Sequence, residues 1–204
     1  MAGIKKRIHI DSVPPFEKTL LENKGMTTEL LERLSKSFLV ARSDNRIRDN
    51  ILFRQSVLIG AGSVLLFARS SLDISLVPES AVEVIVEGKE PLGKILTKWE
   101  LETGRRNFEY FTVSDDWQAS LMFSAAAASS PVFQKLLWRI CCGSSFFPGQ
   151  TLANIFLRSW LSATGSGQAE RYWARSYEIC SGPDRVARIE EIFSPYIKTR
   201  IREQ

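Results

Sequence analysis

Charged side chains are almost absent from one long stretch in the middle of this 204-residue chain. In the 53 residues from Trp117 to Ala169, the only charged side chains are Lys135, Arg139 and Arg158. The other 151 residues hold 47 of the 50 charges. Because charged side chains are rarely buried, such a stretch predicts a buried helical unit or an insertion in a more ordinary domain. We therefore expect one domain over 1–204, with a helical insertion at about 117–169.

The parts on either side of this stretch alternate between strand and helix signals. Strands are expected at Ile51–Ile59, Ser63–Ser70 and Asn107–Val113, followed by a terminal hairpin of Tyr172–Ile179 and Arg185–Phe193. Helices are expected at Thr27–Phe38, with Thr27 and Thr28 as candidate N-caps, and at Pro78–Glu87 and Leu92–Lys98. Inside the charge-poor stretch, Pro131–Ile140 and Gln150–Ala163 also fit helices.

Histidine and cysteine are too scarce for several kinds of catalytic site. His9 is the one histidine, so a His-rich zinc site is excluded, and a Ser-His-Asp or Cys-His unit would have to use this residue near the chain end. The three cysteines include the adjacent pair Cys141 and Cys142, which argues against a disulfide framework. A reducing compartment, the cytoplasm or a plastid stroma, is expected. Any chemistry must therefore use carboxylates, Lys, Arg, Tyr and backbone groups.

The net charge of +4 does not by itself indicate nucleic acid. Basic residues are spread along the chain and mixed with acidic ones, which favours a solvated surface. The basic cluster near the N-terminus has no apolar core behind it, so we expect no signal peptide. No run of about 18 apolar residues is present, so no membrane-spanning segment is expected.

Arg54 lies in the middle of an apolar predicted strand, and Arg69 lies in its expected antiparallel partner. An unpaired guanidinium in apolar surroundings is costly, so an arginine in a half-buried strand needs an anion. That anion is either a protein carboxylate, in a structural ion pair, or the carboxylate of a ligand held by two hydrogen bonds.

Glu190 and Glu191 are neighbours in the last predicted strand, so their side chains face opposite ways. Glu191 shares a face with Ile189 and Phe193, which makes it the inward candidate. A carboxyl group beside apolar neighbours can act as a general acid. The alternative is a structural ion pair with Arg54 or Arg188.

Two further stretches are candidate anion sites. Pro91-Leu92-Gly93 opens a predicted helix, whose first backbone N–H groups have no partner within the helix. Arg105 and Arg106 precede the strand that starts near Asn107. They form either a second anion site or a basic turn.

Four short motifs follow one another along the two flanking parts. They are Phe53-Arg54 with Ala68-Arg69 fifteen residues later, Pro91-Leu92-Gly93, Glu102-Thr-Gly-Arg-Arg106, and Glu191-Ile-Phe-Ser-Pro195. In this order they resemble the chorismate pyruvate-lyase family, whose enzymes make 4-hydroxybenzoate. The similarity covers roughly Arg48–Val113 and Arg171–Pro195.

The resemblance implies an α+β fold. One antiparallel sheet of about six strands would carry short helices over a buried ligand pocket. In this family the first-strand arginine holds the ring carboxylate, the backbone at the Pro-Leu-Gly leucine assists, and the last-strand glutamate meets the opposite end. These roles fall on Arg54, on Leu92 with Gly93, and on Glu191. Arg69 and Arg106 match further basic positions, which are expected to meet the enolpyruvyl carboxylate.

The resemblance also implies a cofactor-free lyase, without a metal, that removes pyruvate from chorismate, with Arg54 and Glu191 as its catalytic residues. Loss of the enolpyruvyl ether and a ring proton makes the ring aromatic, so anion clamps, a dry pocket and one acid/base carboxylate suffice. The partner would be a small-molecule substrate, the product would serve quinone biosynthesis, and family habit favours a monomer.

Two other classes of function stay open. A non-catalytic aromatic-acid-binding or sensor domain of the same fold would show nearly the same features. An interaction protein would use the charge-poor helices of 117–169 to contact a membrane surface or another protein.

Overall fold

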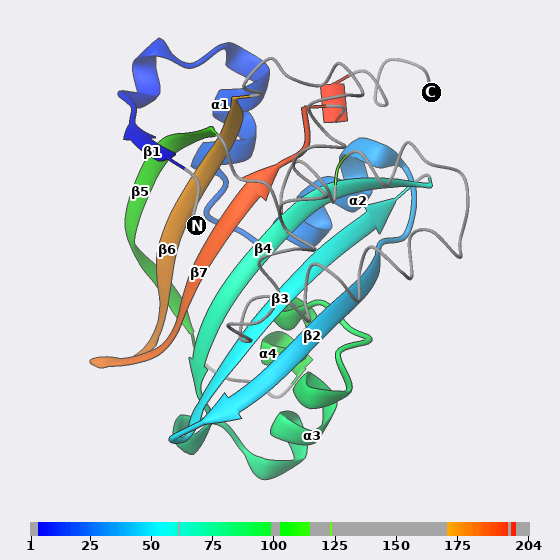
Figure 1. The fold of residues 1–204 in the computed structure, drawn as a ribbon, viewed down its shortest axis with the longest axis vertical. Helices are drawn as coiled ribbons and strands as arrows, with labels where there is room; N and C mark the ends of the chain where they lie inside the picture. The colour runs from blue at the N-terminus through cyan, green and yellow to red at the C-terminus, as the bar shows by residue number, and fades with distance from the viewer. Residues whose placement is uncertain are drawn as a thin grey trace, which may run out of the picture.

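A single seven-stranded sheet forms the centre of the molecule. The computed structural model describes residues 4–60, 62–98, 103–114, 123, 171–195 and 197–198. The strands are β1 (Ile4–Arg7), β2 (Val40–Arg48), β3 (Ile51–Gly60), β4 (Ser63–Asp73), β5 (Gly104–Ser114), β6 (Tyr172–Ser181) and β7 (Asp184–Phe193). Their order is β1-β5-β6-β7-β4-β3-β2, and every pairing is antiparallel (Figure 1). The α+β fold with one antiparallel sheet is thus confirmed.

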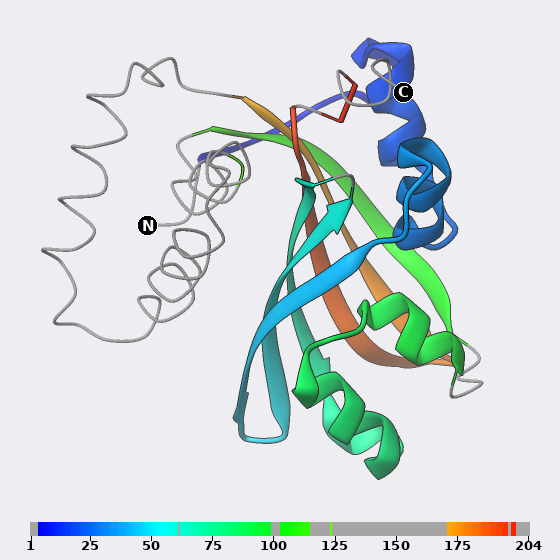
Figure 2. The same ribbon diagram turned by 90° about the vertical axis from the view of Figure 1, so that its right-hand side faces the viewer.

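The described helices all lie on one face of this sheet, which we call the inner face (Figure 2). They are α1 (Pro15–Glu22), α2 (Thr27–Ser35), α3 (Glu79–Glu87) and α4 (Leu92–Lys98), with short 3-10 turns η1 (Ile10–Ser12) and η2 (Ile74–Leu76). Among the described residues, no helix is long and apolar enough to cross a membrane.

Tight turns join the strands that follow directly in sequence. Asp49 and Asn50 both have positive φ between β2 and β3, as a two-residue hairpin turn with strands of this twist requires. Gly182 has a φ of +57 between β6 and β7, and Gly62 has a φ of +73 between β3 and β4. These residue types tolerate the left-handed region best, which explains why the chain reverses at these points.

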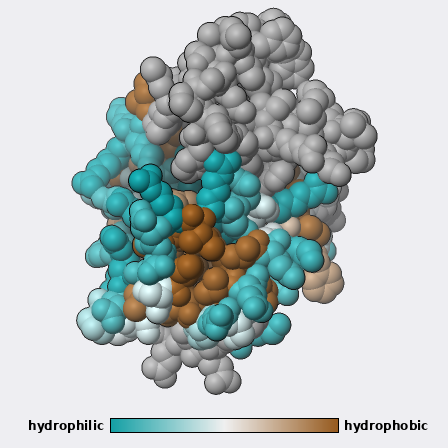
Figure 3. Space-filling model, turned by 60° about the horizontal axis from the view of Figure 1, so that its bottom comes forward, coloured by the Kyte–Doolittle hydropathy of each residue, from teal (hydrophilic) through white to brown (hydrophobic). Residues whose placement is uncertain are grey.

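Two apolar cores lie between the inner face and the helices. One packs α1 and α2 against the sheet and contains Leu21, Leu31 and Leu66. The other packs α3 and α4 against the opposite end of the sheet and contains Ile85, Ile95 and Ile189. From below, hydrophobic side chains form one area that is bordered by hydrophilic ones (Figure 3).

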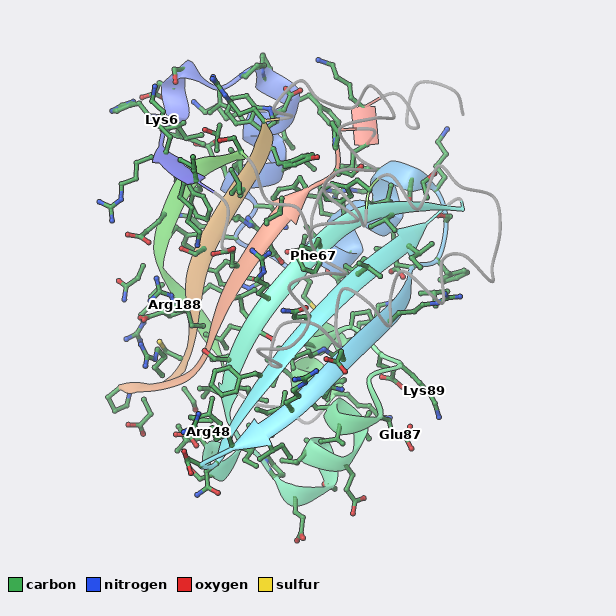
Figure 4. All side chains as sticks on the ribbon, in the orientation of Figure 1. Lys6, Arg48, Phe67, Glu87, Lys89 and Arg188 are labelled. Atoms are coloured by element: carbon green, nitrogen blue, oxygen red, sulfur yellow. The ribbon has the colours of Figure 1, made fainter. Side chains whose placement is uncertain are left out.

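The opposite face of the sheet, the outer face, is also partly apolar. Phe67 on β4 (Figure 4) and Ile192 on β7 face this way and are fully buried. Phe123, the described residue of the charge-poor stretch, is buried with its ring 5.3 Å from that of Tyr172 on β6. The predicted helices at 131–140 and 150–163 lie outside the described residues.

The structure corrects several local predictions. Met26, not Thr27 or Thr28, is the N-cap of α2, because both threonines already lie within the helix. The helix ends at Ser35 with Lys36 in the left-handed conformation, so Phe38 does not join its apolar stripe and is 91% exposed. Helix α1 and the strands β1 and β2 were not predicted from the sequence. These two strands and the five predicted from local signals make up the seven-stranded sheet, in place of the expected six or so.

Candidate functional site

A cavity lies between the inner face of the sheet and the first turns of α2 and α4. Its floor comes from alternating residues of β3, β4 and β7, and its cover from α2 and α4. The lining residues are Thr27, Thr28, Ser56, Leu58, Leu66, Ala68, Ser70, Pro91, Leu92, Gly93, Arg105, Tyr177, Ile179, Ile189 and Glu191. The centres of water-sized molecules can occupy about 60 Å³ of it.

Glu191 is the buried carboxylate of this cavity. One oxygen, Oε1, accepts hydrogen bonds from the Thr27 hydroxyl at 2.7 Å and the Tyr177 hydroxyl at 3.1 Å. The other, Oε2, accepts one from Arg175 Nε at 2.7 Å. Burial, together with the nearby Glu191 charge, raises the pKa of Tyr177 above its usual value, so the phenol remains a donor. The prediction that Glu191 faces inward is confirmed.

Arg175 on β6 is the ion-pair partner of Glu191, in place of the expected Arg54 or Arg188. Its side chain is fully buried and also donates to the carbonyls of Leu21 and Asn23 and to the hydroxyl of Thr27. One guanidinium therefore connects the cavity carboxylate to the end of α1 and the start of α2. Arg175 was not predicted from the sequence as a site residue, although an arginine within the apolar strand 172–179 carries the same signal that singled out Arg54.

Arg54 is 2% exposed and lies directly behind the cavity wall. Its Nη1 donates to the carbonyl of Ile85 at 3.0 Å and its Nη2 to that of Glu90 at 2.6 Å. Its strand partner Ser70 and the next residue after Glu90, Pro91, both line the cavity. Among the described residues, no carboxylate lies within ion-pair distance of Arg54, so the structural ion pair with a protein carboxylate is not found there. Arg54 Nε has no hydrogen-bond partner among these residues.

The C-terminal end of α3 explains how this lone guanidinium is tolerated. The last carbonyls of a helix lack intrahelical partners and carry partial negative charge. The Ile85 carbonyl, which accepts from Arg54, belongs to this end and also accepts from the Asn45 side chain at 3.0 Å. These carbonyls do not fully replace the hydration that the guanidinium loses, since burial lowers the pKa of Arg54 from 12.5 to about 10.

The two neighbouring arginines of β5 face opposite ways. Arg105 pairs with Ile179, lines the cavity and donates to the carbonyl of Gly25, with its guanidinium 5.0 Å from the centre of the Tyr177 ring. Arg106 pairs with Glu178 on the outer face and is exposed. Arg106 was the member of this doublet predicted to bind substrate, whereas the structure brings Arg105 to the cavity.

Arg69 also lies away from the cavity. Its neighbours Ala68 and Ser70 line the cavity, so the side chain of Arg69 projects from the outer face. There Arg69 Nη1 is 3.0 Å from Glu190 Oε1, and Glu190 also pairs with Lys5. The prediction that Arg69 lies in the ligand site is not supported by this placement.

Leu92 and Gly93 lie at the cavity, where the sequence analysis expected them. The contact between α4 and α2 holds them there: Lys94 Nζ is 2.7 Å from Glu32 Oε1, which also accepts from the backbone of Leu39. A Cβ on Gly93 would lie 3.6 Å from the sulfur of Met26.

Among the described residues, no three His, Cys, Asp or Glu side chains gather closely enough to hold a metal ion.

Comparisons with known proteins return distant structural likenesses. No family model and no curated protein matches the sequence. The effector domain of PhnF from Mycobacterium smegmatis is 10% identical with a TM-score of 0.45, over 85% of this chain and 90% of that chain. The C-terminal domain of the histidine utilization repressor from Pseudomonas syringae pv. tomato str. DC3000 is 8% identical with a TM-score of 0.35, over 77% and 86%. At these values no ligand or activity follows for this chain.

Proposed function

We propose that this chain is a binding domain for a small monocyclic organic acid, such as 4-hydroxybenzoate. The observation that carries the proposal is the state of Arg54. A buried guanidinium that lacks a carboxylate partner among the described residues stands next to an apolar cavity. A ligand carboxylate at the end of the cavity near Ser70 and Pro91 would pair with its free Nε and complete the charge balance.

The opposite end of the cavity suits a hydrogen-bond donor. Glu191 accepts three hydrogen bonds and has capacity for one more, since two carboxylate oxygens offer about four acceptor sites. The strand register places Arg54 and Glu191 two strands and two residues apart, or about 12 Å between Cα atoms. A six-membered ring with a carboxylate at one end and a hydroxyl at the other would lie between these two side chains.

Calorimetric titration of the full chain with 4-hydroxybenzoate tests the proposal. We expect saturable binding, and a loss of affinity of about 10- to 100-fold in Arg54→Met, the range of one charged hydrogen bond. Arg69→Met removes an arginine from the adjacent strand but from the outer face, so its affinity should equal that of the wild type. Absence of binding, or equal binding by Arg54→Met, contradicts the proposal.

A second candidate function is the lyase reaction on chorismate. The presence of Glu191, Leu92 and Gly93 on one cavity, with Arg54 behind it, supports it. We place it second because Glu191 is held by three donors, one of them a guanidinium, which suits accepting a hydrogen bond better than donating a proton.

The turnover assay separates the two functions. The full chain is incubated with chorismate, and 4-hydroxybenzoate and pyruvate are quantified. Stoichiometric release of both, abolished by Glu191→Gln, would establish the lyase. Binding of 4-hydroxybenzoate without release of pyruvate would leave the binding domain as the function.

A further inference from the structure

Two residues on the floor of the cavity carry hydroxyl groups. They are Ser56 on β3 and Ser70 on β4, and both are half-buried and line the cavity. Neither hydroxyl has a hydrogen-bond partner among the described residues. A polar side chain that faces a cavity without a partner is satisfied by water or by a ligand group. The two serines are therefore candidate ligand contacts.

The strand register places both serines beside Arg54. Ser70 pairs directly with Arg54, and Ser56 follows Arg54 by two residues on the same face of β3. Ala68 pairs with Ser56 and completes a rectangle of four neighbouring positions. Ser56 and Ser70 occupy opposite corners of this rectangle, with about 8 Å between their Cα atoms from the strand spacing and rise. A group above the centre of the rectangle is thus about 4 Å from each Cα, measured along the sheet.

A carboxylate suits this position. Its two oxygens face opposite sides, so each of them can accept a hydrogen bond from one serine hydroxyl. Arg54 at the third corner supplies the positive charge, since it is buried and has no carboxylate within ion-pair distance among the described residues. Hydrogen bonds to a charged acceptor are about twice as strong as those between neutral groups.

The fourth corner leaves room for the ring. Ala68 carries only a methyl group, and on its other side it pairs with Glu191 on β7. The ring of a ligand whose carboxylate lies between the serines can therefore pass over Ala68 toward Glu191. This direction is the one that the proposed function requires.

We infer that Ser56 and Ser70 bind the two oxygens of the ligand carboxylate and form, together with Arg54, a three-point carboxylate clamp. The inference rests on the proposed function, because it takes the carboxylate to lie at the Arg54 end of the cavity. It narrows the ligand class to free ring acids. An uncharged substituent in place of the carboxylate loses the attraction of Arg54 and both charge-assisted hydrogen bonds.

Calorimetric titrations of the full chain with 4-hydroxybenzoate and with 4-methylphenol test the clamp. The second probe keeps the ring and the hydroxyl but has a methyl group in place of the carboxylate. Ser56→Ala and Ser70→Ala should each bind 4-hydroxybenzoate about 10- to 100-fold more weakly than the wild type, the range of one hydrogen bond to a charged group. Neither variant should bind 4-methylphenol more weakly than the wild type. Ser71→Ala, on the outer face of β4, is the matched control and should bind both probes like the wild type.

The outcomes separate the clamp from the proposed function. If the wild type binds 4-hydroxybenzoate and either serine variant binds it equally well, the clamp is refuted while ring-acid binding stands. A parallel loss of affinity for 4-methylphenol also refutes the clamp, because the serines would then shape the cavity without contacting the carboxylate. If the wild type does not bind 4-hydroxybenzoate, the proposed function fails and the clamp fails with it. Thermal melts of each variant without ligand distinguish a lost contact from a lost fold.

Discussion

Arg175→Met is the most informative test of how the cavity is built. The substitution keeps an apolar stem of similar length but removes a guanidinium that is fully buried and makes four hydrogen bonds. Glu191 would then be a buried carboxylate with two hydroxyl donors and no opposite charge. Breaking a buried ion pair from one side costs about 3–5 kcal/mol. For a chain of this length we expect the melting temperature to fall by about 6–20 °C.

A double variant tests whether the cost arises from the orphaned charge. Arg175→Met with Glu191→Leu removes both ions, and well-packed apolar replacements for a buried pair are often nearly neutral. We therefore expect the double variant to be more stable than Arg175→Met alone, as measured by urea unfolding at pH 7. Arg185→Met is the control, because its ion pair with Glu178 is on the surface and its loss should change little.

A free energy of unfolding for Arg175→Met within about 1 kcal/mol of the wild-type value would refute this prediction, because an uncompensated buried carboxylate costs more than that. A double variant that is less stable than Arg175→Met would refute it as well. In that case the hydrogen bonds to α1 and α2, and not the charge on Glu191, would account for the loss.

Three further predictions concern single positions. Burial raises the pKa of Tyr177, so the folded chain keeps a proton that the unfolded chain loses near pH 10, and stability should fall as pH rises beyond that value; melts from pH 8 to 11 should show a smaller loss in Tyr177→Phe. Gly88 has a φ of +72, and a Cβ there would lie 3.0 Å from a side-chain nitrogen of β2. Gly62 has a φ of +73 but open space around it, so Gly62→Ala should lose only the roughly 1–2 kcal/mol that the left-handed conformation costs. Urea unfolding should therefore show a larger loss of unfolding free energy for Gly88→Ala than for Gly62→Ala. Phe38→Ala should leave stability within about 0.5 kcal/mol, whereas Leu31→Ala in the core should cost about 2–5 kcal/mol; equal melting temperatures for these two variants would refute the placement of α2.

Local patterns were sufficient for the central hairpins. The runs of apolar and β-branched residues around Arg54 and Arg69, with glycines between them, predicted β3 and β4, and the terminal hairpin was predicted in the same way. The edge strand β2 was missed because Val40–Arg48 is rich in charged and polar residues. Such residues suit an edge that needs only one neighbour, but they give no apolar alternation to detect.

The site was predicted in part. Glu191, Leu92 and Gly93 lie on one cavity, and parity along the strand was enough to choose Glu191 over Glu190. Arg106 was selected by the resemblance, and strand parity could not have corrected the choice, because the bulge after Arg106 and the positive φ of Asn107 change the facing of β5. No pattern in the sequence marks that bulge.

The sequence by itself determined that the parts flanking the charge-poor stretch form antiparallel hairpins with short helices, and that any chemistry must use carboxylates, Lys, Arg, Tyr and backbone groups. These properties follow from local periodicity and from which side chains are present at all. Only the tertiary structure decided which charges meet. Arg175 pairs with Glu191, and Arg54 meets helix carbonyls in place of a carboxylate, because strands far apart in sequence become neighbours in the sheet. Pairing across strands depends on register, which is set by the whole fold and not by any one segment.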